Sequence, residues 1–279
     1  MKTLPRSVRI VLLPVLLLLP APASAGPWTK DLGQFYLKLG ESLFFADAYR
    51  GADGQLVEGE TTYLGVSTSL YYEVGVYKGL HLWGYLPYLV AQNNFQKSGR
   101  STLNASGGDA LLGVQYSPPF TLLFPAALKL EIKVPLYEVA EIPIGFAAPG
   151  DGQLDFAFFV SAGGSLGKVP LFFYGELGYR LRSDVFVGQS SGASFGDGLA
   201  YFASVGYTLW ERLTVSLNSG GSLPFDSGQA TKGYVTLGPA VYVVLWRGLA
   251  AEASFDPMIY TNQNASPGFG FSLGVSYKN

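Results

Sequence analysis

The last strand-like segment of the chain alternates large apolar side chains with small ones, residue by residue. The large set is Phe269, Phe271, Leu273, Val275 and Tyr277, and the intervening residues are Gly270, Ser272, Gly274 and Ser276. Because successive side chains of a β-strand point to opposite faces, one face is bulky and apolar and the other is small. A soluble sandwich would pack its bulky face on a core. A small, polar second face instead predicts a barrel strand with lipid outside and a lumen inside.

The first 25 residues have the pattern of an export signal. Lys2, Arg6 and Arg9 form a basic start, residues 10–19 are apolar, and Ala23-Ser24-Ala25 is a small-residue cleavage site. The apolar run is too short to span a bilayer. We therefore predict a signal peptide at 1–25 and one barrel domain at 26–279, exported to the bacterial outer membrane.

Composition agrees with a lipid-facing wall. Charged residues are 14% of the chain, against about 25% in ordinary soluble domains, while glycine (36 residues) and aromatics (15%) are abundant. The absence of cysteine excludes a disulfide framework and a thiol-linked lipid anchor. The formal charge of −2 argues against nucleic acid as a partner. The expected partners are outer-membrane lipid and a small-molecule solute, and the oligomeric state is left open.

The alternation predicts an all-β fold, a transmembrane antiparallel up-and-down β-barrel of twelve strands. The expected strands are 34–45, 61–74, 80–90, 108–117, 126–135, 153–162, 170–182, 199–209, 212–219, 233–245, 248–256 and 268–278. Short connections alternate with long ones, as periplasmic turns alternate with outer loops. Pro87 and Pro239 fall inside expected strands, so each is expected to mark a bulge or a boundary. Residues 26–33 are too few for a plug domain, so we expect loops or lumen side chains to narrow the pore.

Charged residues follow the lumen-facing phase of the middle strands. They are Asp109, Lys129, Glu131, Lys133, Asp155, Glu176, Arg180 and Arg182. Opposite signs on neighbouring strands predict ion pairs across the ladder. Two interpretations remain open: a charged strip that orients a permeating solute, or paired charges that stiffen a narrow barrel.

Aromatic residues share the same inward phase, among them Trp83, Tyr85 and Tyr174. Aromatic surfaces beside a few charges are typical of sites for small amphipathic molecules, although rings also fill a barrel of this size. The function we expect is an outer-membrane channel or transporter for passive uptake of small hydrophobic or aromatic solutes. The alternatives are a structural or adhesion barrel with a closed lumen, and a lipid-modifying barrel enzyme.

Catalytic and metal signals are weak, and we expect no enzyme activity, no cofactor and no metal. Two Gly-x-Ser-x-Gly matches, at 163–167 and 188–192, lack the strand-to-helix context that a nucleophile needs. His81 is the only histidine, which disfavours a transition-metal site. The acidic residues Asp47, Asp53, Glu58 and Glu60 leave a calcium site open.

The middle of the chain resembles a family of bacterial outer-membrane transporters of the phenol meta-degradation pathway type. The matching features are Gly108-Asp109, Leu112-Gly113, Tyr116, Lys133-Val134-Pro135, and Gly152 with Asp155. The resemblance implies a barrel for the passage of hydrophobic or aromatic compounds. Two departures concern Leu136-Tyr137, where the family has Thr-Gly, and the C-terminal Lys278-Asn279, where the family ends on an aromatic residue.

Overall fold

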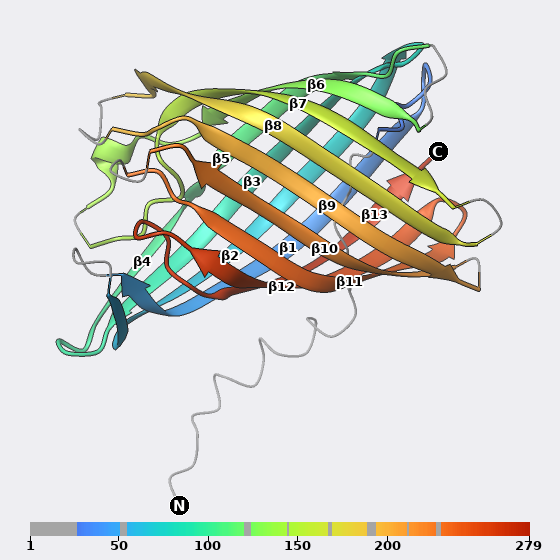
Figure 1. Cartoon of the computed structure of the whole chain (residues 1–279). Coiled ribbons are helices and arrows are strands. Elements are labelled where there is room, and N and C mark those ends of the chain that lie inside the picture. Colours follow the sequence, from blue (N-terminus) through green and yellow to red (C-terminus); the bar gives the residue numbers. More distant parts are fainter. Residues whose placement is uncertain are drawn as a thin grey trace, which may run out of the picture.

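The chain forms a single closed barrel, shown by a computed structural model (Figure 1). The structure describes residues 27–50, 55–119, 124–143, 145–166, 169–188, 194–210, 212–226 and 230–279. The predicted signal peptide therefore lies outside the described residues. Within these ranges, no helix has both the length and the apolar character needed to cross a bilayer.

Thirteen strands and one short 3-10 helix make up the described chain. They are β1 (Phe35–Arg50), β2 (Leu56–Tyr77), β3 (Leu80–Phe95), β4 (Arg100–Gly107), β5 (Asp109–Tyr116), β6 (Ala126–Pro135), η3 (Val139–Glu141), β7 (Gln153–Ser165), β8 (Leu171–Phe186), β9 (Gly198–Leu209), β10 (Leu213–Pro224), β11 (Tyr234–Trp246), β12 (Leu249–Thr261) and β13 (Phe269–Lys278). All pairings are antiparallel, and β1 closes the barrel by pairing with both β2 and β13. β4 and β5 pair with successive parts of the same edge of β3, so together they take the place of one strand. The thirteen strands therefore form a twelve-stranded barrel. The predicted twelve-stranded antiparallel barrel is confirmed.

The break between β4 and β5 lies opposite a proline. The pairing of β3 with β4 ends at Tyr88 and Gly107, and its pairing with β5 starts at Tyr85 and Leu111. Pro87, between these two points, has no N–H to donate, and its carbonyl accepts from the Gly108 N–H at 3.0 Å. The β11–β12 ladder is likewise interrupted around Pro239, because its pairs skip from Thr236 to Ala240. Both prolines sit at ladder irregularities.

Most of the described residues in two of the predicted long loops belong to strands. Residues 46–60 and 91–107 were expected to be loops, but β1 continues to Arg50, β2 starts at Leu56, β3 continues to Phe95 and β4 starts at Arg100. The apolar alternation stops where the wall leaves the lipid, whereas the backbone ladder continues with polar side chains. The segment 136–152 between β6 and β7 is a true long connection.

The N-terminal segment corrects a second expectation, because it does narrow the lumen. Pro27 is fully buried, and its carbonyl accepts from the Ser117 hydroxyl at 2.6 Å. Lys30 Nζ lies 2.6 Å from Glu73 Oε2 inside the barrel. A side chain at Gly75 would collide with the Asp31 carbonyl, so glycine is needed for this close approach. Residues 27–31 therefore pack into the lumen at the end that carries the short turns.

Candidate functional site

The predicted charged strip lies on the lumen side of β5 to β8. On β6, Lys129, Glu131 and Lys133 are each 7% exposed, while the alternating Leu128 and Leu130 are 45% and 55% exposed on the outside. The two-residue period of the strand separates these faces. The buried charges are paired: Arg180 Nη2, for example, lies 3.4 Å from Glu131 Oε1 across β7.

We call the part of the lumen lined by Lys129, Glu131, Glu176 and Arg180 the waist, and Lys129 lies at its centre. Its Nζ lies 2.6 Å from Glu176 Oε1 and also 4.9 Å from the Trp83 ring and 4.2 Å from the Phe159 ring. The Tyr174 hydroxyl donates to the other oxygen of Glu176 at 2.9 Å. The ammonium therefore has both an ionic and a cation–π environment, on a side chain that is 9% exposed. Four predicted site residues, Lys129, Glu176, Trp83 and Tyr174, meet here.

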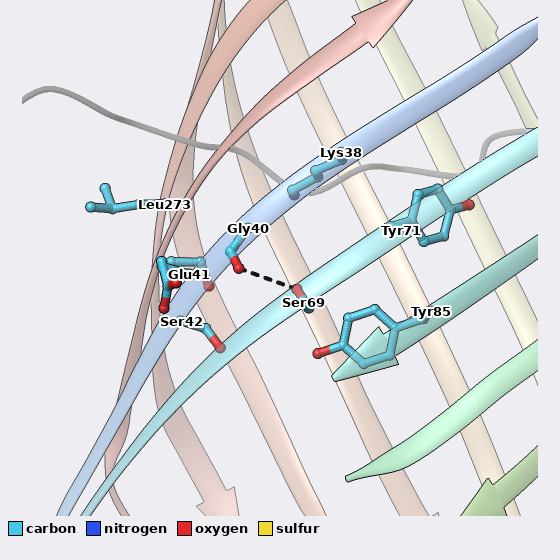
Figure 2. Close-up of a pocket in the computed structure, with 9 residues that line it drawn as sticks. Lys38, Gly40, Glu41, Ser42, Ser69, Tyr71, Tyr85 and Leu273 are labelled. Atoms are coloured by element: carbon cyan, nitrogen blue, oxygen red, sulfur yellow. Dashed lines mark hydrogen bonds between the residues drawn. The ribbon is translucent and has the colours of Figure 1, made fainter. Parts of the chain in front are cut away.

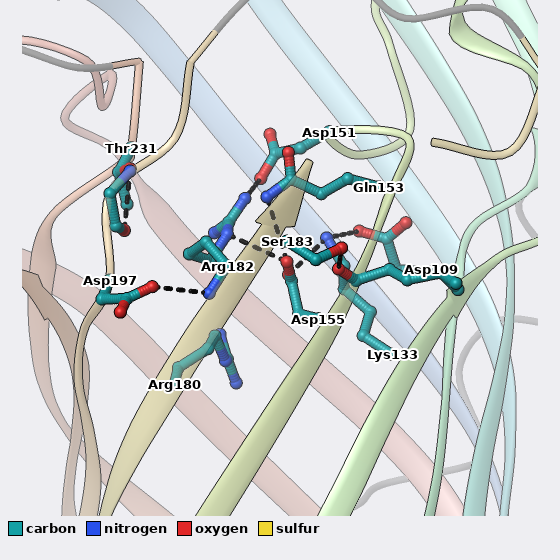
Figure 3. Close-up of polar contacts among 12 residues, drawn as sticks. Asp109, Lys133, Asp151, Gln153, Asp155, Arg180, Arg182, Ser183, Asp197 and Thr231 are labelled. Carbon is teal, nitrogen blue, oxygen red and sulfur yellow. Dashed lines mark hydrogen bonds and ion pairs between the residues drawn. The ribbon is translucent and has the colours of Figure 1, made fainter. Parts of the chain in front are cut away.

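A second ionic cluster lies toward the long-loop end (Figure 3). Lys133 Nζ lies 2.8 Å from Asp155 Oδ2 and 3.3 Å from Asp109 Oδ2. Arg182 bridges Asp155 and Asp151, at 3.2 Å and 2.5 Å. Because each charge has partners on both sides, the cluster connects β5, β6, β7 and β8 with the end of the 136–152 segment.

Tyr137 ties the start of this segment to its end. Its hydroxyl donates to Asp109 Oδ1 at 2.9 Å and accepts from the Gly152 N–H at 3.0 Å. Burial and the neighbouring Asp109 carboxylate together raise the pKa of Tyr137, so the phenol stays protonated. Burial acts to raise the pKa of Asp151, but Lys232 and Arg182 outweigh it and hold that pKa below its usual value. The carboxylate therefore stays ionised beside its cations.

The same segment also contacts β4, which pairs with β3 on the side of the barrel that carries β5 and β6. The Gly145 carbonyl accepts from Thr102 Oγ1 at 2.9 Å, and the Ala147 carbonyl accepts from Asn104 Nδ2 at 2.8 Å. Both donors lie on β4, so residues 145–151 form a strap anchored on β4 at one end and on the ionic cluster at the other.

A cavity of about 840 Å³ lies in the long-loop half of the barrel, beside the strap. We call it the vestibule. Its lining is mainly apolar and aromatic: Phe44, Ala46, Ala48, Tyr49, Thr61, Tyr63, Leu89, Phe95, Ala147, Ala148, Pro149, Tyr234, Met258 and Ala265, with Glu60, Asn93, Lys232, Asn264 and Ser266. This is the size and lining of a small-molecule site. None of the three aromatic residues that the sequence analysis names, Trp83, Tyr85 and Tyr174, lines this cavity.

Two smaller cavities continue the lumen. One of about 310 Å³ lies at the waist, against Lys129, Glu131, Glu176 and Arg180, and it shares Tyr234 with the vestibule. The other, of about 250 Å³, lies over β1, β2 and β13, with Lys38, Tyr71 and Tyr85 along it (Figure 2). Tyr85 therefore faces this side cavity, whereas Trp83 and Tyr174 line the waist around Lys129.

The sequence analysis missed two further pairs in the lumen. Lys38 Nζ lies 2.9 Å from Glu252 Oε2, and Tyr36 donates to the other Glu252 oxygen at 2.7 Å. Glu73 holds Lys30 of the N-terminal segment. The signal was available, because Lys38 and Glu73 both fall on the inward phase of their strands.

The weak catalytic signals gain no support from the geometry. His81 is fully buried, and its Nδ1 accepts from the Lys30 N–H at 3.3 Å. Ser165 ends β7 instead of opening a helix, and residues 189–192 of the second serine motif lie outside the described chain. Among the described residues, no group of three or more metal-binding side chains is arranged to hold an ion, and Asp53 falls outside them.

No protein-family model matches the chain, and no curated protein matches its sequence. Solved structures do match its shape. An outer-membrane channel from Pseudomonas putida F1 aligns at a TM-score of 0.70 and 10% identity, covering 93% of this chain and 99% of the channel. The translocator domain of the autotransporter NalP from Neisseria meningitidis aligns at 0.52 and 9% identity, covering 89% of each chain. The likeness at such low identity concerns the fold alone, and that fold is the outer-membrane β-barrel.

Proposed function

We propose that the chain is an outer-membrane channel for passive uptake of small hydrophobic or aromatic solutes, which bind first in the vestibule. The observation that carries this proposal is the contrast between the two halves of the lumen. The long-loop half holds an apolar and aromatic cavity of about 840 Å³, while the waist below it is lined with paired charges. An apolar solute gains by leaving water for such a cavity.

The residues of the waist have a second role in this proposal. Lys129, Glu131, Glu176 and Arg180 line the next cavity, and Tyr234 borders both compartments. A solute that moves inward passes from the aromatic lining of the vestibule to the charged lining of the waist. There the electric field of the charged side chains acts on the dipole or charge of the solute, because confined water screens it weakly. The resemblance of residues 108–155 to transporters of the phenol meta-degradation pathway type also favours aromatic solutes.

The test is solute flux into liposomes that contain the purified protein, comparing a neutral aromatic, an aromatic acid and a sugar. We expect the neutral aromatic to enter fastest. Ala148→Trp fills the vestibule and should reduce this flux at least tenfold. Leu217→Trp, on the outward face of β10, is the matched control and should leave the flux unchanged.

A closed structural barrel is the second candidate, and one observation favours it. Residues 27–31 fill the short-turn end, and the waist charges are buried in pairs. If the wild-type protein passes none of the three solutes, the channel proposal fails and the closed barrel takes its place.

A further inference from the structure

A carboxyl group faces outward on the barrel wall where lipid is expected. Along β1, the outward positions are Leu37, Leu39, Glu41, Leu43 and Phe45, and Glu41 is exposed. Its inward neighbours Gly40 and Ser42 face the lumen. Within the part of the barrel that the structure describes, Glu41 is the one acidic or basic side chain turned outward between the levels of Leu37 and Phe45.

The depth of Glu41 follows from the strand register. Leu37 pairs with the interfacial residues Tyr277 and Tyr72, and Phe45 pairs with Phe269. Glu41 lies four residues from each level. Four residues at about 3.3 Å each, on a strand tilted by about 40°, rise roughly 10 Å along the membrane normal. Glu41 is therefore near the middle of the apolar band of about 25 Å.

Among the described residues, one side chain forms a hydrogen bond with Glu41. The Thr68 hydroxyl donates to Glu41 Oε1 at 2.6 Å, and Thr68 is its direct neighbour on β2. Thr68 in turn pairs with Tyr88 on β3, which is 51% exposed on the same outward face. One row across three strands thus carries an acceptor and two hydroxyl groups, in a region where acyl chains offer no hydrogen bonds.

We propose that the outward face of β1 and β2 is the docking surface for a second copy of this chain, with the twofold axis between Glu41 and Thr68 and with Tyr88 of β3 at its edge. Barrels of one kind insert in one orientation, so two copies relate by a twofold axis along the membrane normal. Each residue then stays at the same depth in both copies. The Glu41 carboxyl of one copy meets the hydroxyl groups of the other, and the reverse contact forms as well.

The surrounding surface suits a close approach. A side chain at Gly84 would collide with the Tyr72 ring, so that ring lies flat along the wall instead of projecting from it. The residues flanking Glu41 in the outward phase, Leu39 and Leu43, are aliphatic and pack readily. This inference rests on the outer-membrane location in the proposed function and not on the solute.

The chain has no cysteine, so single cysteines report contacts directly. In isolated outer membranes treated with a lipid-soluble oxidant, Leu39→Cys and Leu43→Cys should form disulfide-linked dimers. Leu217→Cys, outward on β10 and 53% exposed, is the control and should stay monomeric. Adding Glu41→Leu to the Leu39→Cys chain should lower the dimer yield at least fivefold, whereas Glu41→Gln should retain most of it.

Folding and location are checked first by recovery of a heat-modifiable band from the outer-membrane fraction, because a chain missing from that fraction refutes the location instead of the interface. Glu41→Leu should fold as well as wild type, since leucine suits lipid better than a carboxyl group. Three results would overturn the proposal: dimer yields at Leu39→Cys and Leu43→Cys no higher than at Leu217→Cys, full dimer yield with Glu41→Leu, or a disulfide to a different protein.

Discussion

Replacing Lys129 by methionine tests the waist most directly. The side chains of Lys129 and Glu176 are each 9% exposed, and their charged atoms lie 2.6 Å apart. Removing one member of a buried ion pair costs about 3–5 kcal/mol, because the other charge stays buried alone. Glu176 keeps the hydrogen bond from Tyr174 at 2.9 Å, so we take the lower end, about 3 kcal/mol.

A double variant that also neutralises Glu176 tests whether this cost comes from the unpaired carboxylate. In the double variant Lys129→Met, Glu176→Gln, no unpaired charge remains, and Tyr174 can still donate to the amide oxygen. The double variant should therefore be within about 1 kcal/mol of wild type, although it changes more atoms. Lys129→Met should then be roughly 2 kcal/mol less stable than the double variant in the free energy of unfolding, and this difference reports the unpaired Glu176 carboxylate.

Urea unfolding of the barrel in phospholipid vesicles, followed by tryptophan fluorescence, measures these differences. Lys97→Met is the control, because Lys97 pairs with Glu60 on the surface and is 79% exposed, and it should show no measurable change. The reasoning is refuted if Lys129→Met alone costs less than the double variant.

Three further predictions follow from the wall and the strap. Leu130→Arg puts a cation on the lipid face and should cost about 2–4 kcal/mol in the free energy of unfolding, whereas Thr236→Arg, which lines the waist cavity, should cost far less; equal costs would mean the faces are misassigned. Tyr137→Phe removes two buried hydrogen bonds, so amide exchange of residues 145–152 should speed up by about tenfold or more, and unchanged exchange would contradict the strap. The pKa of Asp151 is held below its ordinary value of about 3.9, so the stability from its ion pairs is complete above that pH and is lost as the pH falls through the lowered pKa; the protection factors of the strap amides, which correct each exchange rate for the intrinsic rate at that pH, should therefore be smaller at pH 3 than at pH 7.

The two-residue period carried most of the fold prediction. In β6 it separates Lys129, Glu131 and Lys133 from Leu128 and Leu130 without any other information. The period says nothing about strand length beyond the lipid, because both faces are polar there. The alternation therefore predicts loops at 46–60 and 91–107, although residues 46–50, 56–60, 91–95 and 100–107 continue the ladder.

Which lumen charges form ion pairs depends on the stagger of neighbouring strands, and the alternation in the sequence does not give that stagger. Lys133 and Asp155 are direct neighbours on β6 and β7, and neighbouring strands of opposite charge predict such a pair. Lys129 instead reaches across β7 to Glu176 on β8, past the Phe159 ring. This contact depends on the stagger of three strands, which closure of the whole barrel sets. The N-terminal segment was missed for a similar reason, since Lys30 has its partner Glu73 only once the barrel has closed.

In the proposed channel, one wall of the lumen carries the ion pairs and the facing wall provides the path for the solute. On β5 to β8 the charges hold one another, so a solute that displaced Lys133 or Lys129 would leave buried carboxylates unpaired at a cost of several kcal/mol. On β9 to β11 several inward residues are small and uncharged, and two of them bond to each other where Ser204 donates to Asn218 Oδ1 at 2.7 Å. The waist cavity lies between these walls, with Gly220 and Thr236 facing the charges. The route of least cost for an apolar solute therefore follows the small-residue wall, while the ion pairs on the opposite wall stay intact and define the polarity of the passage.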